Sequence, residues 1–293
     1  MKNNQVKHAT LQFESILSNK IRLDQLIYEL GYFDSKEKAR SAIMQGCIKI
    51  AGKLIDKAGY QINSEKFYAE LDLNPKYIEV DDKLQKYVSR GAFKLEAAFK
   101  AFNLDFNDTV VLDIGASTGG FTDFSLQHGA KKVLALDVGK GQLHYKLQKD
   151  NRVLNLEGLN FRNFSLEDLL ASLANLENTE TRAPQHVPKL DFIVSDLSFI
   201  SLTKVAERIV ELAKHFKPAP RIILLLKPQF EASKEIADKF KGVISDAALR
   251  DEIVDELIEK LSEQGLYLKE KIASPIKGTK GNQEYLAEFT LLK

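Results

Sequence analysis

Short apolar runs alternate with segments of helical spacing through the C-terminal two-thirds of the chain. This alternation predicts a mostly parallel sheet whose consecutive strands are joined by helices. The run Ile222-Ile223-Leu224-Leu225-Leu226 is apolar at every position, which is typical of a central strand buried on both faces. The expected strands are 110–113, 133–137, 153–157, 191–196 and 221–227.

The end of the chain breaks this alternation. A long helix is expected over 246–264, and two strands follow at 267–273 and 285–292 without a helix of normal length between them. Because two strands joined by a short loop run antiparallel, the last strand should oppose its neighbours. A further helix, ending near Asn103, precedes the first strand. We therefore expect an α/β protein with a Rossmann-like sheet of seven strands, the last one antiparallel.

The first 75 residues follow a different pattern. Apolar residues at helical spacing predict helices over 23–30 and 36–46, and two short apolar runs around Ala51-Gly52 predict a β-hairpin. Leu73-Asn74-Pro75 ends this part, and the charged segment after it has the composition of a linker. The predicted organisation is an N-terminal extension (1–20), a small α+β domain (21–75), a linker (76–86) and a large α/β domain (87–293).

A glycine-studded turn follows the first strand of the large domain. Asp113 lies at the end of that strand, and Gly115, Gly119 and Gly120 leave out side chains where the backbone must approach a ligand closely. Three residues separate Gly115 from the glycine pair, so the loop does not match the G-x-G-x-x-G fingerprint of dehydrogenases. Asp137 ends the second strand, where a carboxylate can accept hydrogen bonds from both ribose hydroxyls of a nucleoside.

Two charged residues follow later strands of the same sheet. Asp196 ends the fourth strand and Lys227 ends the fifth, so both should emerge at the edge that carries the glycine loop. Lys94 lies in the helix before the first strand, and Glu284 comes immediately before the last strand. An ordinary surface charge is the alternative interpretation for each of the four.

Composition and charge narrow the classes of function. The net charge is +1, so nucleic-acid binding would have to depend on a local basic face. Cys47 is the single cysteine and the five histidines are scattered, which excludes an intrachain disulfide and makes a metal site improbable. Residues 1–20 contain no signal-peptide core, and no apolar run approaches the roughly 20 residues of a membrane helix. We expect a cytoplasmic protein that binds neither membrane nor metal.

The small domain resembles the ribosomal-protein-S-four-type RNA-binding domain, the α-L motif. The matching words are Arg22-Leu23-Asp24, Lys38-Ala39-Arg40, and Gly46 before Ile48-Lys49-Ile50-Ala51-Gly52. The resemblance implies binding of structured RNA, chiefly through its phosphates. A solvated charged surface is the alternative, because acidic residues dilute the positive charge. The basic residues expected at RNA are Arg22, Lys36, Lys38, Arg40, Lys49 and Lys53, together with Arg90 of the large domain.

The large domain resembles the FtsJ-like RNA ribose 2′-O-methyltransferases, and in particular the TlyA family, which carries the same RNA-binding module. In order, Lys94, Asp196, Lys227 and Glu284 match the Lys-Asp-Lys-Glu tetrad of those enzymes. The resemblance implies S-adenosylmethionine as cofactor, ribosomal RNA within ribosomal subunits as partner, and cytidine as target. A monomer is favoured. The flanking words are Tyr87-Val88-Ser89-Arg90-Gly91, Gly115-Ala116-Ser117-Thr118-Gly119-Gly120-Phe121-Thr122, Asp196-Leu197-Ser198-Phe199-Ile200, Lys227-Pro228-Gln229-Phe230-Glu231 and Gly281-Asn282-x-Glu284-Tyr285.

The tetrad suits the chemistry of a ribose hydroxyl, which is a poor nucleophile until its proton is drawn off. An amine of lowered pKa, or an ammonium that stabilises the alkoxide, can do this, and Lys227 is our candidate. Asp196 would orient Lys227, while Lys94 and Glu284 complete the ion network. Phe199 and Phe230 are expected in the core rather than against a target base. The cofactor-binding residues expected are Asp113, Gly115, Ser117, Thr118, Gly119, Gly120, Phe121, Asp137, Asn160 and Asp196.

Three alternatives remain open at this point. TlyA-like proteins have been called haemolysins, so a membrane-active protein is one, although the chain has no spanning run or strongly basic amphipathic segment. A catalytically inactive RNA-binding assembly factor is the second. An NAD-dependent dehydrogenase is the third, and the spacing of the glycines disfavours it.

Overall fold

A computed structural model describes residues 20–33, 35–44, 46–57, 59–74, 76–80, 86–177, 189–278 and 281–291. The expected N-terminal extension, apart from Lys20, lies outside the described residues. The chain divides into two compact units, with the boundary in the sequence between Lys86 and Tyr87.

The N-terminal unit contains the two helices and the hairpin expected from the sequence. In the hairpin, Ile48 pairs with Ile55, and Ala51 and Gly52 both have positive φ, as tight hairpin turns require. Helix α3 and two paired two-residue strands, β1 and β4, were not expected. The elements are β1 (Ile21–Arg22), α1 (Leu23–Glu29), α2 (Lys36–Met44), β2 (Ile48–Ile50), β3 (Lys53–Ile55), β4 (Gln61–Ile62), α3 (Ser64–Leu73) and β5 (Ile78–Val80).

Strand β5 corrects the expected linker. Residues 78–80 pair antiparallel with β2 and complete a three-stranded sheet of the N-terminal unit, so this part of 76–86 does not link. The strand escaped prediction because its alternation of buried and exposed positions is short and lies in a charged segment. Ile78 is buried, Glu79 is exposed and Val80 is half-buried. Three residues are too few for that period to stand out in the sequence. Residues 81–85 lie outside the described part of the chain.

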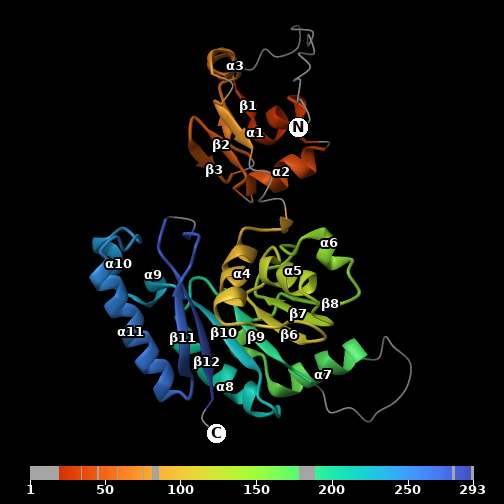
Figure 1. The fold of residues 1–293 in the computed structure, drawn as a ribbon, viewed down its shortest axis with the longest axis vertical. Coiled ribbons are helices and arrows are strands. Elements are labelled where there is room, and N and C mark those ends of the chain that lie inside the picture. Colours follow the sequence, from red (N-terminus) through yellow and green to blue (C-terminus); the bar gives the residue numbers. More distant parts are fainter. Residues whose placement is uncertain are drawn as a thin grey trace. The chain divides into compact units, whose positions relative to one another are not determined.

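The C-terminal unit is built on one sheet of seven described strands, in the order β11-β12-β10-β9-β6-β7-β8 (Figure 1). Neighbours from β10 to β8 are parallel, and β12 is antiparallel to both β10 and β11. The expected fold class, an α/β protein with a Rossmann-like sheet of seven strands, the last one antiparallel, and a small N-terminal α+β domain, is confirmed. The strands are β6 (Val110–Ile114), β7 (Lys132–Asp137), β8 (Val153–Glu157), β9 (Phe192–Ser195), β10 (Arg221–Leu226), β11 (Tyr267–Ala273) and β12 (Tyr285–Thr290).

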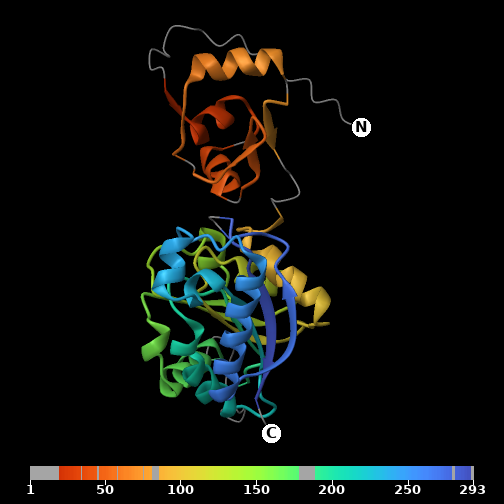
Figure 2. The same ribbon diagram turned by 90° about the vertical axis from the view of Figure 1, so that its left-hand side faces the viewer.

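Helices cover both faces of this sheet (Figure 2). Apolar residues of α4, α5 and α6 pack on one face, and those of α7, α8 and α11 pack on the other. The helices are α4 (Gly91–Ala101), α5 (Gly120–Gln127), α6 (Tyr145–Gln148), η2 (Phe161–Asn163), α7 (Leu166–Glu177), η3 (Leu202–Lys204), α8 (Ala206–Lys214), α9 (Pro228–Glu231), α10 (Lys234–Lys239) and α11 (Ala247–Glu263).

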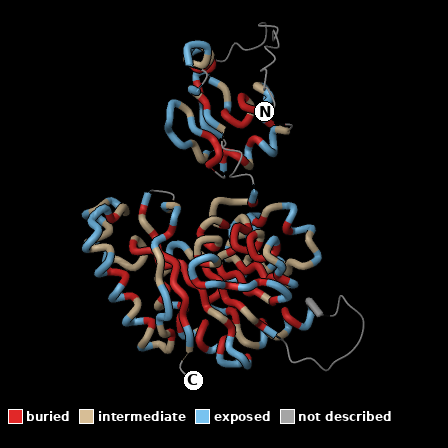
Figure 3. Tube along the Cα trace, in the orientation of Figure 1, coloured by how far each residue is buried: buried red, intermediate tan, exposed pale blue. Residues whose placement is uncertain are grey.

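Strand β10 shows why the apolar run belongs at the centre. Ile222, Leu224 and Leu226 pack with the α8 and α11 side, while Ile223 and Leu225 pack with the α4 and α5 side. All five are at most 1% exposed, and buried strands form the middle of the unit in Figure 3. The prediction of a strand buried on both faces is confirmed.

The strand order fixes the place of the site. The chain leaves β6 toward β7 on one side, whereas β9 pairs with β6 on the other, so the order reverses at β6. Ligands of open α/β sheets bind beyond the carboxyl ends of strands at such a reversal. The glycine loop, Asp196 and Lys227 follow β6, β9 and β10 at this edge.

Arg221 joins three of the elements that carry the tetrad. It lies at the start of β10, and its guanidinium donates to both carboxylate oxygens of buried Glu288 on β12, at 2.8 and 2.9 Å. The same group donates to the carbonyl oxygens of Phe102 and Asn103, just after α4. Lys269 reaches Glu288 from β11 at 3.3 Å, but half of its side chain is exposed.

We expect Arg221→Ala to lower the free energy of unfolding of the C-terminal unit by about 2–4 kcal/mol, because Glu288 loses its bidentate partner in a buried position. Lys269→Ala is the control, and its exposed pair should contribute less than about 1 kcal/mol. Urea unfolding of the full chain measures both. Equal effects of the two substitutions would contradict this ranking.

Candidate active site

Four charged side chains meet at the carboxyl edge of the sheet. Lys94 Nζ lies 3.2 Å from Asp196 Oδ2 and 2.8 Å from Glu284 Oε2. Lys227 Nζ lies 2.5 Å from Asp196 Oδ1 and donates to Ser198 Oγ at 2.7 Å. Asp196 therefore stands between two ammonium groups, and the cluster contains two positive and two negative charges.

The fold brings these residues together from positions far apart in the sequence. Lys94 lies in the first turn of α4, Asp196 and Lys227 directly follow β9 and β10, and Glu284 directly precedes β12. Since β9 and β10 are adjacent and parallel, their carboxyl ends present Asp196 and Lys227 side by side. The antiparallel direction of β12 places its beginning, and hence Glu284, at the same edge.

Burial makes the ion pairs of the cluster strong. Lys94, Lys227 and Glu284 are less than 9% exposed, whereas the side chain of Asp196 is 21% exposed. Burial alone would lower the pKa of Lys94, but the carboxylates of Asp196 and Glu284 outweigh it and raise that pKa. Burial would likewise raise the pKa of Asp196, but the two lysines outweigh it and lower that pKa. Lys94 and Asp196 are therefore held in their charged forms.

Gln229 and Gly278 fix the position of Glu284. Gln229 Nε2 donates to Glu284 Oε1 at 3.0 Å, opposite the oxygen that pairs with Lys94. A Cβ at Gly278 would lie 2.5 Å from Glu284 Oε1, so a side chain there would displace the carboxylate. Sequence reasoning missed both residues and Ser198. The available signals were that Ser198 and Gln229 lie two residues after Asp196 and Lys227, within the words that resemble the TlyA family.

A side chain at any of the glycines of the loop after β6 would run into other atoms of the protein. A Cβ at Gly119 would lie 2.2 Å from Leu147 Cδ1, and one at Gly120 would lie 2.9 Å from Ala92 N on α4. At Gly115 it would lie 3.1 Å from the carbonyl oxygen of Asp196. Close protein packing therefore occupies the space that side chains at these glycines would fill, and the expected close approach of their backbone to a ligand stays a prediction.

Asp137 connects two loops at the end of β7. Its carboxylate accepts hydrogen bonds from Ser117 N at 2.8 Å and from Gly139 N at 2.7 Å. Ser117 is itself exposed and has φ of +48°, so the loop presents its tip to solvent. Thr118 accepts a hydrogen bond from His144 N through its carbonyl oxygen, and Phe121 is buried below the loop.

Asp113 lies beneath the loop and is fully buried. Thr122 Oγ1 donates to Asp113 Oδ2 at 2.6 Å, while Oδ1 has no hydrogen-bond partner among the described residues. Burial raises the pKa of Asp113 to about 7, although the bond from Thr122 opposes this rise. The raised pKa favours the protonated form of this carboxyl group, which is tied to the first turn of α5 through Thr122.

The surroundings of the loop fit S-adenosylmethionine. Asp137 places a carboxylate at the strand end, where ribose hydroxyls can donate to it. Val138 and Leu159, which are 69% and 40% exposed, offer apolar surface beside it for a base, and Leu159 N donates to Asp137 O. The unpartnered oxygen of Asp113 adds an acceptor under the loop. Asn160 caps η2 by accepting from Arg162 N at 3.1 Å, so its expected contact with a cofactor stays a prediction.

Phe199 departs from the expectation of a core aromatic. Its side chain is 91% exposed, and its φ is +63°. The ring lies 5.1 Å from that of Phe230, which is half-buried and 5.7 Å from Lys227 Nζ. The expectation is wrong for Phe199 because the loop after β9 turns outward at this residue, which no periodic pattern reveals.

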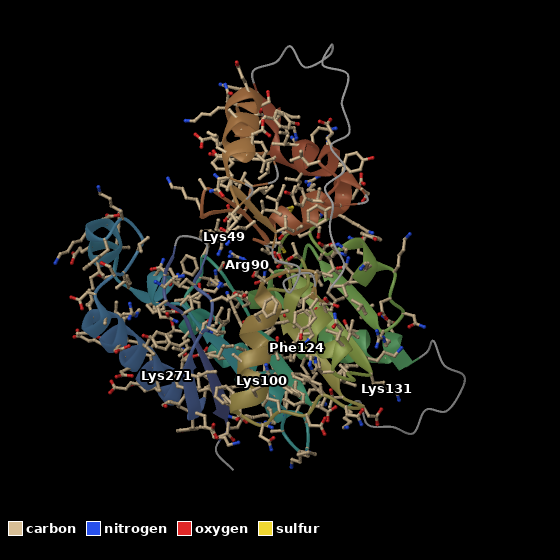
Figure 4. All side chains as sticks on the ribbon, turned by 45° about the horizontal axis from the view of Figure 1, so that its top comes forward. Lys49, Arg90, Lys100, Phe124, Lys131 and Lys271 are labelled. Atoms are coloured by element: carbon tan, nitrogen blue, oxygen red, sulfur yellow. The ribbon has the colours of Figure 1, made fainter. Side chains whose placement is uncertain are left out.

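The basic residues expected at RNA fall into two groups. Arg22 is engaged within the N-terminal unit, because its guanidinium forms a two-point contact with buried Asp24 at 2.6 and 3.0 Å. Lys49 lies on the hairpin, and Arg90 lies half-buried at the start of α4 (Figure 4). The exposed members of the set are Arg22, Lys36, Lys38, Arg40, Lys49 and Lys53, of which Arg22 is the one held by Asp24.

The raised pKa of Asp113 predicts a pH dependence of stability. Between about pH 4 and pH 7 the folded chain holds a proton on Asp113 that the unfolded chain releases, so the free energy of unfolding falls as pH rises through this range. Asp113→Asn should remove this contribution, which amounts to at most about 4 kcal/mol. Urea unfolding at pH 5 and pH 8 measures it, with exposed Asp105→Asn as control. An unchanged pH slope in Asp113→Asn would contradict the assignment.

Comparison with known proteins identifies the family of each unit. Residues 87–290 match the FtsJ-like methyltransferase family, and residues 21–66 match the S4 domain. Among the described residues, no helix is long and apolar enough to cross a membrane, and no group of His, Cys, Asp or Glu side chains is arranged to hold a metal ion.

Relatives extend over almost the whole chain. Hemolysin A of Brachyspira hyodysenteriae is 40% identical over 271 residues, which cover 92% of this chain and 100% of that protein. The 16S/23S rRNA (cytidine-2′-O)-methyltransferase TlyA of Mycobacterium tuberculosis (strain CDC 1551 / Oshkosh) is 33% identical over 269 residues, covering 92% and 89%. The solved structure of a protein from Streptococcus thermophilus that is named a hemolysin matches with a TM-score of 0.63 and 33% sequence identity. The match covers 94% of this chain and 90% of that one. The chain belongs to the FtsJ-like methyltransferases, and within them to the TlyA family, in which the methyltransferase domain follows an S4 domain.

Proposed function

We propose that this protein transfers a methyl group from S-adenosylmethionine to the ribose 2′-hydroxyl of a cytidine in ribosomal RNA. The observation that carries the proposal is the Lys94–Asp196–Lys227–Glu284 cluster at the sheet edge that also holds the glycine loop. The activity printed for the TlyA relative supports the substrate, and the S4 match supports RNA as partner.

When bound, S-adenosylmethionine supplies an activated methyl group on a sulfonium. Its nucleoside part would be held by Asp137, by the loop residues Ser117 and Thr118, and by the apolar surface of Val138 and Leu159. The glycine loop lies against the backbone of Asp196 at Gly115, so the methyl donor and the charge cluster share one edge of the sheet. Alignment of the two reactants accounts for much of the rate.

Lys227 acts at the 2′-hydroxyl in this proposal. The oxygen forms a bond with the methyl carbon as the carbon–sulfur bond breaks, the bonding pair stays on sulfur, and the hydroxyl proton must leave. Lys227 Nζ is held by Asp196 and Ser198, both more exposed than itself, so it is fixed at the open side of the cluster. Lys227 is the side chain placed for this step, either as an amine that takes the proton or as an ammonium that stabilises the alkoxide while the proton leaves to water.

Lys94 and Glu284 have a different part. Lys94 bridges Asp196 and Glu284, so its ammonium is paired with a carboxylate on two sides. We infer that they keep Asp196 ionised and in place, and that Glu284 bounds the ribose on the side of β12. Exposed Phe199, close to Phe230 and Lys227, offers a flat face on which a base can stack.

The Lys227→Ala variant tests the proposal. Turnover of methyl groups into ribosomal subunits should fall by about 10³-fold or more, because the group acting on the hydroxyl is lost. Affinity for S-adenosylmethionine should stay within a few-fold, since Lys227 is assigned to the hydroxyl and not to the cofactor. Radiolabel transfer and calorimetric titration measure the two quantities.

Lys100→Ala is the matched control, because Lys100 is a lysine of α4 whose side chain is 70% exposed, at the helix end (Figure 4). Its turnover should equal that of the wild type. Turnover retained by Lys227→Ala would remove Lys227 from the mechanism. Loss of cofactor binding in that variant would show that Lys227 contributes to the cofactor site, so its assignment to the hydroxyl would be wrong.

The exposed lysines of the hairpin test the RNA-binding role of the N-terminal unit. Lys49→Ala and Lys53→Ala should each weaken binding of the full chain to naked ribosomal RNA and reduce the slope of log affinity against log salt by about one. Lys66→Ala, an exposed lysine outside the predicted set, is the control. Unchanged slopes for both hairpin variants would show that this face does not contact phosphates.

A further inference from the structure

Residues 196–202, which follow β9, are held in a conformation that the sequence does not favour by itself. Phe199 has φ of +63°, the left-handed region that aromatic residues rarely adopt, and its ring is almost wholly exposed. Such a backbone persists only when neighbouring contacts impose it. The segment also carries Asp196 and Ser198, which hold Lys227.

The contacts that impose it come from residues 227–231, the segment that begins with Lys227. Three links join the two segments in sequence order. Lys227 pairs with Asp196 and Ser198, the ring of Phe230 lies 5.1 Å from that of Phe199, and Glu231 binds the far end of the loop. The first two links involve residues that face the substrate in the proposed function.

The third link consists of two hydrogen bonds to one carboxylate. Ser201 Oγ donates to Glu231 Oε2 at 2.5 Å, and Leu202 N donates to Glu231 Oε1 at 2.9 Å. Ser201 caps η3, and Gln264 at the end of α11 donates to the carbonyl oxygen of Thr203 at 2.9 Å. The base of the loop is therefore fixed to the body of the unit, and Glu231 connects that base to α9.

We propose that Glu231 is a positioning residue for the methyl transfer: it locks residues 196–202 to 227–231, so that Ser198 and Phe199 stay aligned with Lys227. The inference rests on the proposed function. Glu231 makes its bonds at the end of α9 that lies away from Lys227, so it acts through the loop and not on the reacting atoms. Both carboxylate oxygens are used, which leaves an amide in the same place with one acceptor for two donors.

Kinetics of the full chain give the first test. Glu231→Ala should lower kcat by about ten- to a hundred-fold, because a small displacement of the loop misaligns the reacting groups. The dissociation constant for S-adenosylmethionine should not change. Glu231→Gln keeps one acceptor oxygen, and Ser201→Ala keeps the hydrogen bond from Leu202 N. Each of these variants should therefore lower kcat less than Glu231→Ala does. Glu235→Ala, an exposed glutamate of α10, is the control.

Fluorescence gives a test that does not depend on activity. The chain contains no tryptophan, so Phe199→Trp introduces one indole at the loop tip. Adding Glu231→Ala or Ser201→Ala to this background should lower the anisotropy of the indole, because the loop gains freedom. Adding Glu235→Ala should leave the anisotropy unchanged.

The outcomes separate the two proposals. A fall in kcat together with a fall in anisotropy supports the positioning role. A kcat of Glu231→Ala within two-fold of the wild type, or a lowered kcat with unchanged anisotropy, overturns it. If the wild type does not methylate ribosomal RNA, the proposed function fails, while the anisotropy still reports whether Glu231 holds the loop.

Discussion

The balance of four charges in a mostly buried place is the constraint on which the rest of the site depends. Folding buries two lysine and two carboxylate side chains and so removes most of their hydration. The attraction between the opposite charges must compensate this loss. Removing any one member would leave the cluster with one charge that is not balanced by an opposite one. The balance holds only while α4, β9, β10 and β12 converge at one edge, so the packing of the sheet and the geometry of the cluster support each other.

Close packing then joins this cluster to the cofactor loop. Gly115 lets the loop lie against the carbonyl oxygen of Asp196, and Gly120 lets α5 approach α4, the helix of Lys94. Asp137 fixes the tip of the loop through Ser117 N. The loop that would hold the methyl donor thus touches the same elements as the charge cluster, and a side chain at either glycine would force them apart.

The sequence predicts the sheet well because its strands are apolar runs separated by helices. The placement of Asp196 and Lys227 also follows from the sequence, since parallel strands present their terminal residues at one edge, whereas Lys94 and Glu284 were grouped with them only through the family resemblance. Very short elements such as β5 have too few residues for a period. The outward turn of Phe199 and the two hydrogen bonds to Glu231 depend on contacts between segments that are distant in the sequence, which no local pattern contains.

The position of the methyl group on RNA is the most direct measurement of the central claim. Purified ribosomal subunits would be incubated with the wild-type protein and labelled S-adenosylmethionine, the RNA digested to nucleosides, and the labelled product identified by mass spectrometry. The account predicts 2′-O-methylcytidine as the labelled nucleoside. Label on a base, or no label on RNA from either subunit while the cofactor still binds, would contradict it.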